Sequence, residues 1–274
     1  MEKVDIAGLR IAFERAGAGS PLVLLHGGIG DSRDWRGQLP AFAREFDVIA
    51  WDAPGCGRSS DPPEESFRLA DYADCLAGLV TLLELERPHV LGLSFGAGLA
   101  LELYHRHPKI PRTLILASAY AGWGGSLPSE EVEARLHGVL RDSDRPPEEL
   151  VGEWLPSLRS ESTPPEAVDD MVAIISEFHP VGARTMARAF AEADLREVLP
   201  TIDVPTLLLY GEQDQRSPLH IADDLHDRIP NSELLVIPDV GHMSNYDDPE
   251  RFNDSVLNFL RAHRRPRTTT PDQE

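Results

Sequence analysis

Short apolar runs alternate along most of the chain with segments of helical periodicity. Each run is about five residues long, suits a strand covered on both faces, and ends at a glycine or a polar residue. The segments between them carry apolar residues three and four positions apart. This alternation predicts an α/β fold with a mostly parallel, doubly wound sheet of about eight strands. A strand pair is predicted over 4–15, further strands over 21–25, 47–51, 89–93, 113–117, 206–210 and 233–237, and helices over 69–85, 95–107, 219–228 and 249–263.

One stretch, residues 122–199, interrupts the alternation and shows helical patches separated by proline and glycine. Within it, residues 128–170 hold twelve Asp and Glu residues against four Arg. Such a segment is commonly a solvated helical surface, and it can also be a lid over a site at the strand ends. We expect residues 1–121 and 200–265 to form the α/β core, residues 122–199 a helical cap, and residues 266–274 a frayed tail.

Residues 92–96 read Gly-Leu-Ser-Phe-Gly, a G-x-S-x-G pattern placed between an apolar run and a helical segment. A serine at such a sharp turn exposes its hydroxyl, and the flanking glycines let strand and helix approach closely. The helix N-terminus directs unpaired N–H groups toward developing negative charge. A serine can also cap a helix without chemical function, so Ser94 is a candidate nucleophile that needs partners elsewhere.

Two candidate partners follow later strands. Asp214 ends the sequence Gly-Glu-Gln-Asp after the run 206–210, and His242 lies in a loop after the run 233–237. The order Ser…Asp…His, each after a separate strand, is typical of one arrangement of the serine triad. Alone, each could be a turn aspartate or an ordinary loop histidine, but together they predict a triad of Ser94, Asp214 and His242. The rival carboxylates lie close to His242 in sequence and are Asp239, Asp247 and Asp248.

A glycine-rich turn, His26-Gly27-Gly28-Ile29-Gly30, follows the first of the six apolar runs. It can be an ordinary turn, but its glycines also allow backbone N–H groups to face a ligand, as in an oxyanion hole. No Gly-Lys-Ser/Thr follows it and no G-x-G-x-x-G is present, which excludes two nucleotide-binding motifs. The two cysteines, Cys56 and Cys75, are too few for a cysteine metal site. We therefore expect no cofactor and no metal.

These segments together resemble the α/β-hydrolase superfamily, in particular its small, cap-bearing serine esterases and lactonases. The resemblance implies the α/β-hydrolase fold, with a helical cap inserted after the sixth strand. It implies Ser94 as nucleophile, His242 as general base and then acid, and Asp214 as its orienting partner. It further implies an oxyanion hole formed by the backbone N–H groups of Gly28 and Phe95. The segments that carry it are His26-Gly27-Gly28, Asp52-Ala-Pro-Gly-Cys-Gly-Arg-Ser59, residues 92–96, Gly211-Glu-Gln-Asp214 and Gly241-His242.

A serine at position 94 favours acyl chemistry. Related epoxide hydrolases and haloalkane dehalogenases carry an aspartate there, because their first step is alkylation of a carboxylate. A serine with a histidine base attacks an acyl carbon, which predicts hydrolysis of an ester, a lactone, a thioester or an activated carbon–carbon bond. A cofactor-free peroxidase or acyltransferase with the same triad, and a ligand receptor of the same fold, remain alternatives.

The charge of the chain limits its partners. Lys and Arg total 26 against 46 Asp and Glu, a net charge of −20, which disfavours binding to nucleic acids and acidic membranes. The longest apolar runs are far shorter than the roughly 20 residues of a membrane span, and no secretory signal is visible. We expect a cytoplasmic protein that acts on a small molecule; the sequence gives no indication of its oligomeric state.

Aromatic residues suggest where that small molecule binds. The predicted cap contains four of them, and Trp35 and Phe95 flank the presumed oxyanion hole. Ligand pockets are mostly apolar, although such residues can also be the packing core of the cap. The acidic residues of the cap predict a negative entrance that disfavours anions. We therefore expect a neutral ester or a lactone, such as an N-acyl homoserine lactone, with an apolar acyl part. The expected pocket residues are His26, Gly27, Trp35, Trp123, Trp154, Phe178 and Phe190.

Overall fold

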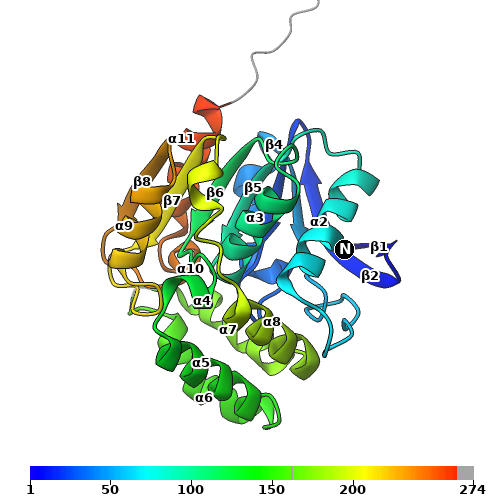
Figure 1. Cartoon of the computed structure of the whole chain (residues 1–274), viewed down its shortest axis with the longest axis vertical. Helices are drawn as coiled ribbons and strands as arrows, with labels where there is room; N and C mark the ends of the chain where they lie inside the picture. Colours follow the sequence, from blue (N-terminus) through cyan, green and yellow to red (C-terminus); the bar gives the residue numbers. More distant parts are fainter. Residues whose placement is uncertain (162, 264–274) are drawn as a thin grey trace, which may run out of the picture.

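A single mixed sheet organises the molecule (Figure 1). The structure is a computed structural model that describes residues 1–161 and 163–263, so the predicted tail 266–274 lies outside the described residues. The sheet has eight strands within this range, in the order β1-β2-β4-β3-β5-β6-β7-β8. β1, β2 and β4 pair antiparallel and all other neighbours pair parallel, which confirms the predicted mostly parallel sheet. The strands are β1 (Glu2–Ile6), β2 (Leu9–Gly17), β3 (Ser20–Leu25), β4 (Phe46–Trp51), β5 (His89–Leu93), β6 (Thr113–Ala117), β7 (Thr206–Gly211) and β8 (Ser232–Ile237).

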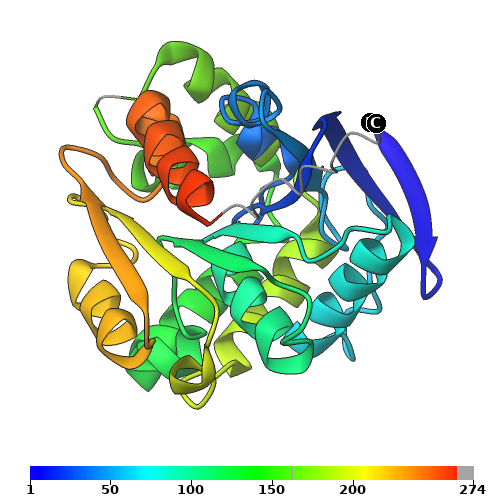
Figure 2. The same ribbon diagram turned by 90° about the horizontal axis from the view of Figure 1, so that it is seen from above.

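Helices cover both faces of this sheet, as Figure 2 shows. Alternate side chains of β3 explain why: Val23 and Leu25 join the core on one face, while Leu22 and Leu24 join the core on the other. The first face packs against α2 (Leu69–Leu82), α3 (Phe95–Arg106) and α9 (Leu219–Arg228). The second packs against α1 (Leu39–Phe42) and α11 (Pro249–Ala262). The apolar runs of β3 to β7 are therefore buried on both sides, as the sequence predicted, whereas the edge strand β8 exposes Leu235 and Val236.

Among the residues that the structure describes, the segment between β6 and β7 forms five α-helices, which we call the inserted helices, and one 3-10 turn just before β7. Figure 1 shows the longer four, α5 to α8, at the lower end of the molecule. A proline occupies the first position of α6, α7 and α8, where a missing N–H costs no hydrogen bond. Phe190 of α8 packs into the same core as α2 and α3. The five are α4 (Trp123–Ser126), α5 (Ser129–Asp142), α6 (Pro147–Leu158), α7 (Pro165–Ser176) and α8 (Pro180–Glu192).

Several short helical turns lie in the loops between longer elements and had no signal in the sequence. The 3-10 turns are η1 (Ser32–Trp35) and η2 (Leu199–Thr201), and α10 (Ser244–Asp247) is a single helical turn. Turns of three or four residues are too short to show helical periodicity. Within the described part of the chain, no helix is both long and apolar enough to cross a membrane.

Candidate active site

Ser94 lies at the junction between β5 and α3, with φ 53° and ψ −110°. This left-handed conformation is strained for a non-glycine residue and is found mostly where a site requires it. The neighbouring glycines make the turn possible. A Cβ on Gly92 would collide with the Gly96 carbonyl, and a Cβ on Gly96 would collide with the carbonyls of Leu25 and His26. The turn leaves the Ser94 side chain half-buried at the wall of a cavity.

His242 and Asp214 form a buried hydrogen-bonded pair at the same edge of the sheet. The Nδ1 atom of His242 lies 2.9 Å from Oδ2 and 3.0 Å from Oδ1 of Asp214. The backbone N–H groups of Arg216 and Ser217 donate to Asp214 Oδ1 at 2.9 and 2.8 Å. Burial alone would raise the pKa of Asp214, but the charge of His242 and these hydrogen bonds outweigh it and lower the pKa. The Asp214 carboxylate is therefore held ionised against the imidazole.

Ser118, the first residue after β6, supports this pair and was not identified from the sequence. Its Oγ donates to the carbonyl oxygen of His242 at 2.9 Å, and its hydroxyl also helps to lower the pKa of Asp214. Ser118 itself has φ 48° and is fully buried. A polar residue directly after an apolar strand was the available signal, the same signal that led to Ser94.

The cavity lies between the loops that follow the carboxyl ends of the strands and the inserted helices. Both Ser94 and His242 line it, and so do Gly28 and Phe95, whose N–H groups are the expected oxyanion hole. Phe95 is the first residue of α3, and the first N–H groups of a helix have no partner within it. The remaining wall is mostly apolar and comes largely from the inserted helices and adjoining loops: Ile29, Val139, Leu158, Met171, Ile174, Ile175, Ala183, Met186, Ala187 and Met243.

Of the predicted pocket residues, the structure brings four to this wall: Gly27, Trp123, Trp154 and Phe190. The other three, His26, Trp35 and Phe178, are buried elsewhere and do not line it. His26 accepts a hydrogen bond from Ala53 N at Nε2 (3.0 Å) and donates from Nδ1 to the Gly27 carbonyl (2.7 Å), so it braces the glycine-rich turn.

Trp35 and Phe178 are core residues. Trp35 packs on Phe252 of α11 on the opposite face of the sheet, with ring centroids 6.3 Å apart. Phe178 packs against Trp154 in a tilted arrangement, with 5.5 Å between the ring centroids, in a small core of the inserted helices. Both aromatic residues are close in sequence to residues of the site, but their side chains do not line the cavity.

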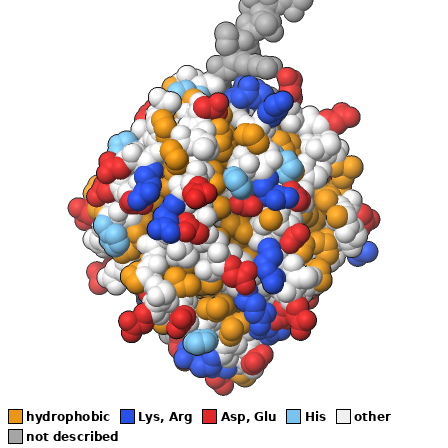
Figure 3. All heavy atoms as spheres, in the orientation of Figure 1, with side chains coloured by type: hydrophobic (Ala, Val, Ile, Leu, Met, Phe, Trp, Pro, Cys, Tyr) orange, Lys and Arg blue, Asp and Glu red, His pale blue; other side chains and the backbone are white. Residues whose placement is uncertain are grey.

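The ionisable groups of the cavity wall are distinct from the negative entrance that the sequence predicted, and that entrance stays a prediction. The ionisable side chains that line it are Asp34, Arg216 and His242. Burial, together with the charge of Asp31, raises the pKa of Asp34 to about 8, so this carboxyl is mostly neutral at pH 7. Ten of the twelve acidic residues in 128–170 are exposed to solvent and none lines the cavity. On the visible face, acidic and basic side chains are interspersed over the lower end of the molecule (Figure 3).

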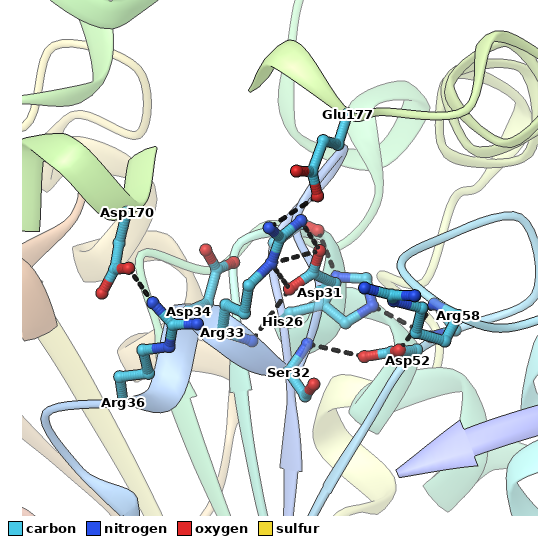
Figure 4. A network of polar contacts seen from close by, with 12 residues as sticks. His26, Asp31, Ser32, Arg33, Asp34, Arg36, Asp52, Arg58, Asp170 and Glu177 are labelled. Atoms are coloured by element: carbon cyan, nitrogen blue, oxygen red, sulfur yellow. Dashed lines mark hydrogen bonds and ion pairs between the residues drawn. The ribbon is translucent and has the colours of Figure 1, made fainter. Parts of the chain in front are cut away.

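Ion pairs join the loop after β3 to the inserted helices (Figure 4). Arg33 forms two ion pairs, from Nη2 to Asp31 Oδ2 at 2.7 Å and from Nη1 to Glu177 Oε2 at 2.8 Å. Glu177 is the residue that follows α7. Arg36 pairs with Asp170 of α7. Because the same loop carries Gly28 and Asp34, these pairs fix the inserted helices relative to the glycine-rich turn. In the part of the chain that the structure describes, no cluster of three His, Cys, Asp or Glu side chains is placed to hold a metal ion.

Known proteins share this architecture. The model of the alpha/beta hydrolase fold family matches residues 20–249. A thermophilic esterase from Thermogutta terrifontis, solved with malate bound, is 30% identical with a TM-score of 0.88 over 96% of this chain and 99% of that chain. An esterase from Exiguobacterium antarcticum is 25% identical with a TM-score of 0.85 over 93% and 97%. The 2-hydroxymuconate semialdehyde hydrolase of Pseudomonas sp. strain CF600 is 28% identical over 272 residues, 94% of this chain and 93% of that protein.

Proposed function

We propose that this chain, which belongs to the alpha/beta hydrolase family, hydrolyses a carboxylic ester or a lactone through an acyl-enzyme on Ser94. One observation carries the proposal. The hydrogen-bonded pair of His242 and Asp214 lies at the end of two parallel strands, and His242 shares an apolar cavity with a serine in a left-handed strand-to-helix turn. Similarity to two esterases over more than nine-tenths of the chain supports the same class of reaction.

In the proposed mechanism each of these residues has its own part. Because Nδ1 of His242 is bonded to Asp214, Nε2 is the nitrogen that accepts the proton of Ser94 Oγ. Ser94 Oγ then attacks the acyl carbon, and the N–H groups of Gly28 and Phe95 stabilise the oxyanion. His242 returns the proton to the leaving oxygen, which gives an acyl-enzyme. Water attacks the acyl-enzyme by the same route, with His242 again as base.

The cavity wall favours a substrate with an apolar acyl part, because its lining is mostly apolar. Short- to medium-chain esters fit this description, and so do lactones such as N-acyl homoserine lactones, whose ring opening needs the same triad. The sequence analysis favoured a neutral substrate, because the acidic residues of the inserted segment were expected to repel anions. Since those acidic residues lie outside the cavity, the proposal covers esters of either charge.

We further propose that residues 122–199 act as the cap of this site, on a core formed by residues 1–121 and 200–265. The inserted helices supply most of the apolar cavity wall, which is the part that a cap would contribute. We also propose a cytoplasmic location. Both cysteines are free and buried, in keeping with a reducing compartment.

The proposal is tested by p-nitrophenyl acetate hydrolysis with the wild-type protein and Ser94→Ala. Turnover that disappears in the variant supports an acyl-transfer enzyme, and absence of turnover on every ester and lactone supports a ligand receptor. Adding hydrogen peroxide or an alcohol and analysing the products separates hydrolysis from perhydrolysis and acyl transfer. Free acid as the main product is the expected result.

A further inference from the structure

Arg216 is a cation at the cavity wall whose backbone is firmly held. It lies two residues after Asp214, and its N–H donates to that carboxylate. Its carbonyl oxygen accepts hydrogen bonds from the Arg135 guanidinium (3.0 Å) and from the Tyr120 hydroxyl. The start of the Arg216 side chain is therefore fixed beside the His242–Asp214 pair, and Arg216 is one of the residues that line the cavity.

The guanidinium of Arg216 has no anionic partner among residues 1–161 and 163–263. Its Nη1 donates to Ser157 Oγ of α6 at 3.1 Å, a neutral acceptor. The neighbouring Arg135, by contrast, pairs with Glu131 at 2.6 Å. Arg216 is half-buried, and burial together with the charge of the neighbouring Arg135 lowers its pKa. An arginine keeps its charge under these conditions.

The other ionisable groups of the wall do not neutralise it. The Asp214 carboxylate is nearby but is bonded to His242 and to two backbone N–H groups. Asp34 also lines the wall, and its pKa of about 8 leaves it mostly protonated at pH 7. The cavity therefore contains one arginine charge that the described protein residues leave open to a ligand.

The chemistry of the site selects the ligand. A guanidinium fork matches a carboxylate in shape and charge. One monovalent cation in an otherwise apolar wall balances one negative charge, whereas a phosphate dianion would leave a second charge unbalanced and desolvated. We propose that Arg216 binds a carboxylate of the substrate, remote from the reacting acyl group, so that the enzyme prefers anionic esters over neutral esters of equal length. This inference rests on the proposed hydrolase function and names its substrate class.

Matched pairs of substrates test it. The first pair is the mono-p-nitrophenyl ester of adipic acid and the same ester with the free carboxyl methylated, which places the charge on the acyl side. The second pair is the butyrate ester of 4-hydroxybenzoate and that of methyl 4-hydroxybenzoate, which places it on the leaving group. For each pair, the ratio of kcat/KM for the anionic to the neutral member is measured at pH 7, with spontaneous hydrolysis subtracted.

We expect the ratio to be about ten or more in at least one pair, and to fall to about one in Arg216→Gln. Arg216→Lys should keep part of it, because the charge remains but the fork is lost. The control is Arg159→Gln, the same change of charge at an exposed residue of the inserted segment that does not line the cavity; it should keep the full ratio. A wild-type ratio near one in both pairs, or a ratio unchanged in Arg216→Gln, would overturn the inference.

A binding measurement separates this inference from the proposed function. Calorimetry of monomethyl adipate and of its neutral analogue dimethyl adipate with Ser94→Ala requires no turnover. Tighter binding of the anion, lost when Arg216→Gln is added, supports the carboxylate subsite even if Ser94 were not the nucleophile. Equal binding of the two compounds contradicts the subsite, whatever the activity of Ser94→Ala.

Discussion

The Oδ2 atom of Asp214 lies 2.9 Å from Nδ1 of His242, although the two residues are 28 positions apart. They meet because β7 and β8 are parallel neighbours, so the loops that follow them leave the same edge of the sheet. The rival carboxylates close to His242 in sequence do not occupy this place. Asp247 instead accepts a hydrogen bond from the N–H of Gly241 (2.8 Å), and Asp248 caps α11.

We predict that Asp214→Asn lowers kcat for ester hydrolysis by roughly ten-thousand-fold, as loss of the equivalent carboxylate does in serine proteases. The amide cannot hold the imidazole in the productive tautomer or stabilise its charged form. The measurement is kcat on p-nitrophenyl butyrate, with circular dichroism to establish that the variant is folded.

Asp247→Asn is the matched control for this prediction. Asp247 joins the His242 loop to the inserted segment, because it also accepts hydrogen bonds from Ser160 N (3.3 Å) and Thr163 Oγ1. For Asp247→Asn we expect a lower melting temperature than that of the wild type, and a loss of kcat far smaller than the loss in Asp214→Asn. If the two variants lost activity in the reverse order, the carboxylate of the triad would have to be reassigned to Asp247.

Asp34 provides a prediction about pH and stability. Its pKa of about 8 lies above the ordinary value of 3.8, so the folded state keeps a proton that the unfolded state has lost between about pH 4 and pH 8. Stability therefore falls as pH rises through this window. Asp34→Asn removes the effect, and its advantage over wild type in free energy of unfolding should grow from pH 5 to pH 8 by on the order of a few kcal/mol.

Urea denaturation of wild type and Asp34→Asn at the two pH values measures this difference. The charged neighbours of Asp34 are Asp31, which raises its pKa further, and Arg33, which lowers it, while the Tyr246 hydroxyl donates to its Oδ1 at 3.3 Å. An equal stability difference at pH 5 and pH 8 would mean that Asp34 is already ionised in the folded protein.

The turn at Ser94 depends on the absence of a side chain at Gly96. We predict that Gly96→Ala destabilises the protein by several kcal/mol, because the added Cβ would meet the backbone carbonyls of Leu25 and His26, which cannot move without displacing β3. Gly138→Ala is the control. A Cβ at this position in α5 meets no atom within 4 Å, and alanine is the better helix former, so stability should rise by about 1 kcal/mol. Thermal unfolding of both variants decides the matter; a neutral Gly96→Ala would mean that β3 and α3 can separate without cost.

The sequence predicted those parts of the fold that depend on local pattern. The six apolar runs predicted β3 to β8, and the strand pair over 4–15 predicted β1 and β2, all within about two residues. The runs were clearest for β3 to β7, because strands buried on both faces carry continuous apolar sequence. Ser94, Asp214 and His242 could be picked out because each follows such a run within a few residues. Parallel strands then bring the three loops to one edge.

The lining of the cavity could not be predicted in the same way. Trp35 and Trp123 are both aromatic and both close to the site, yet Trp35 packs against α11 while Trp123 lines the cavity. Which way each side chain points is set by tertiary packing, which leaves no local pattern. The charge of the site illustrates the same limit: most acidic residues of 128–170 face solvent and none lines the cavity, whereas the half-buried Arg216 does.

An acyl-enzyme on Ser94 can be detected directly by mass spectrometry. The wild-type protein is mixed with p-nitrophenyl butyrate, quenched in acid within milliseconds, and digested for peptide mapping; diethyl p-nitrophenyl phosphate serves as a stable trap of the same nucleophile. We expect a butyryl or diethylphosphoryl group on the peptide that contains Ser94, no label on that peptide in Ser94→Ala, and a loss of turnover on the order of a million-fold in that variant. A label on another residue, or substantial turnover remaining in Ser94→Ala, would contradict an acyl-enzyme on Ser94.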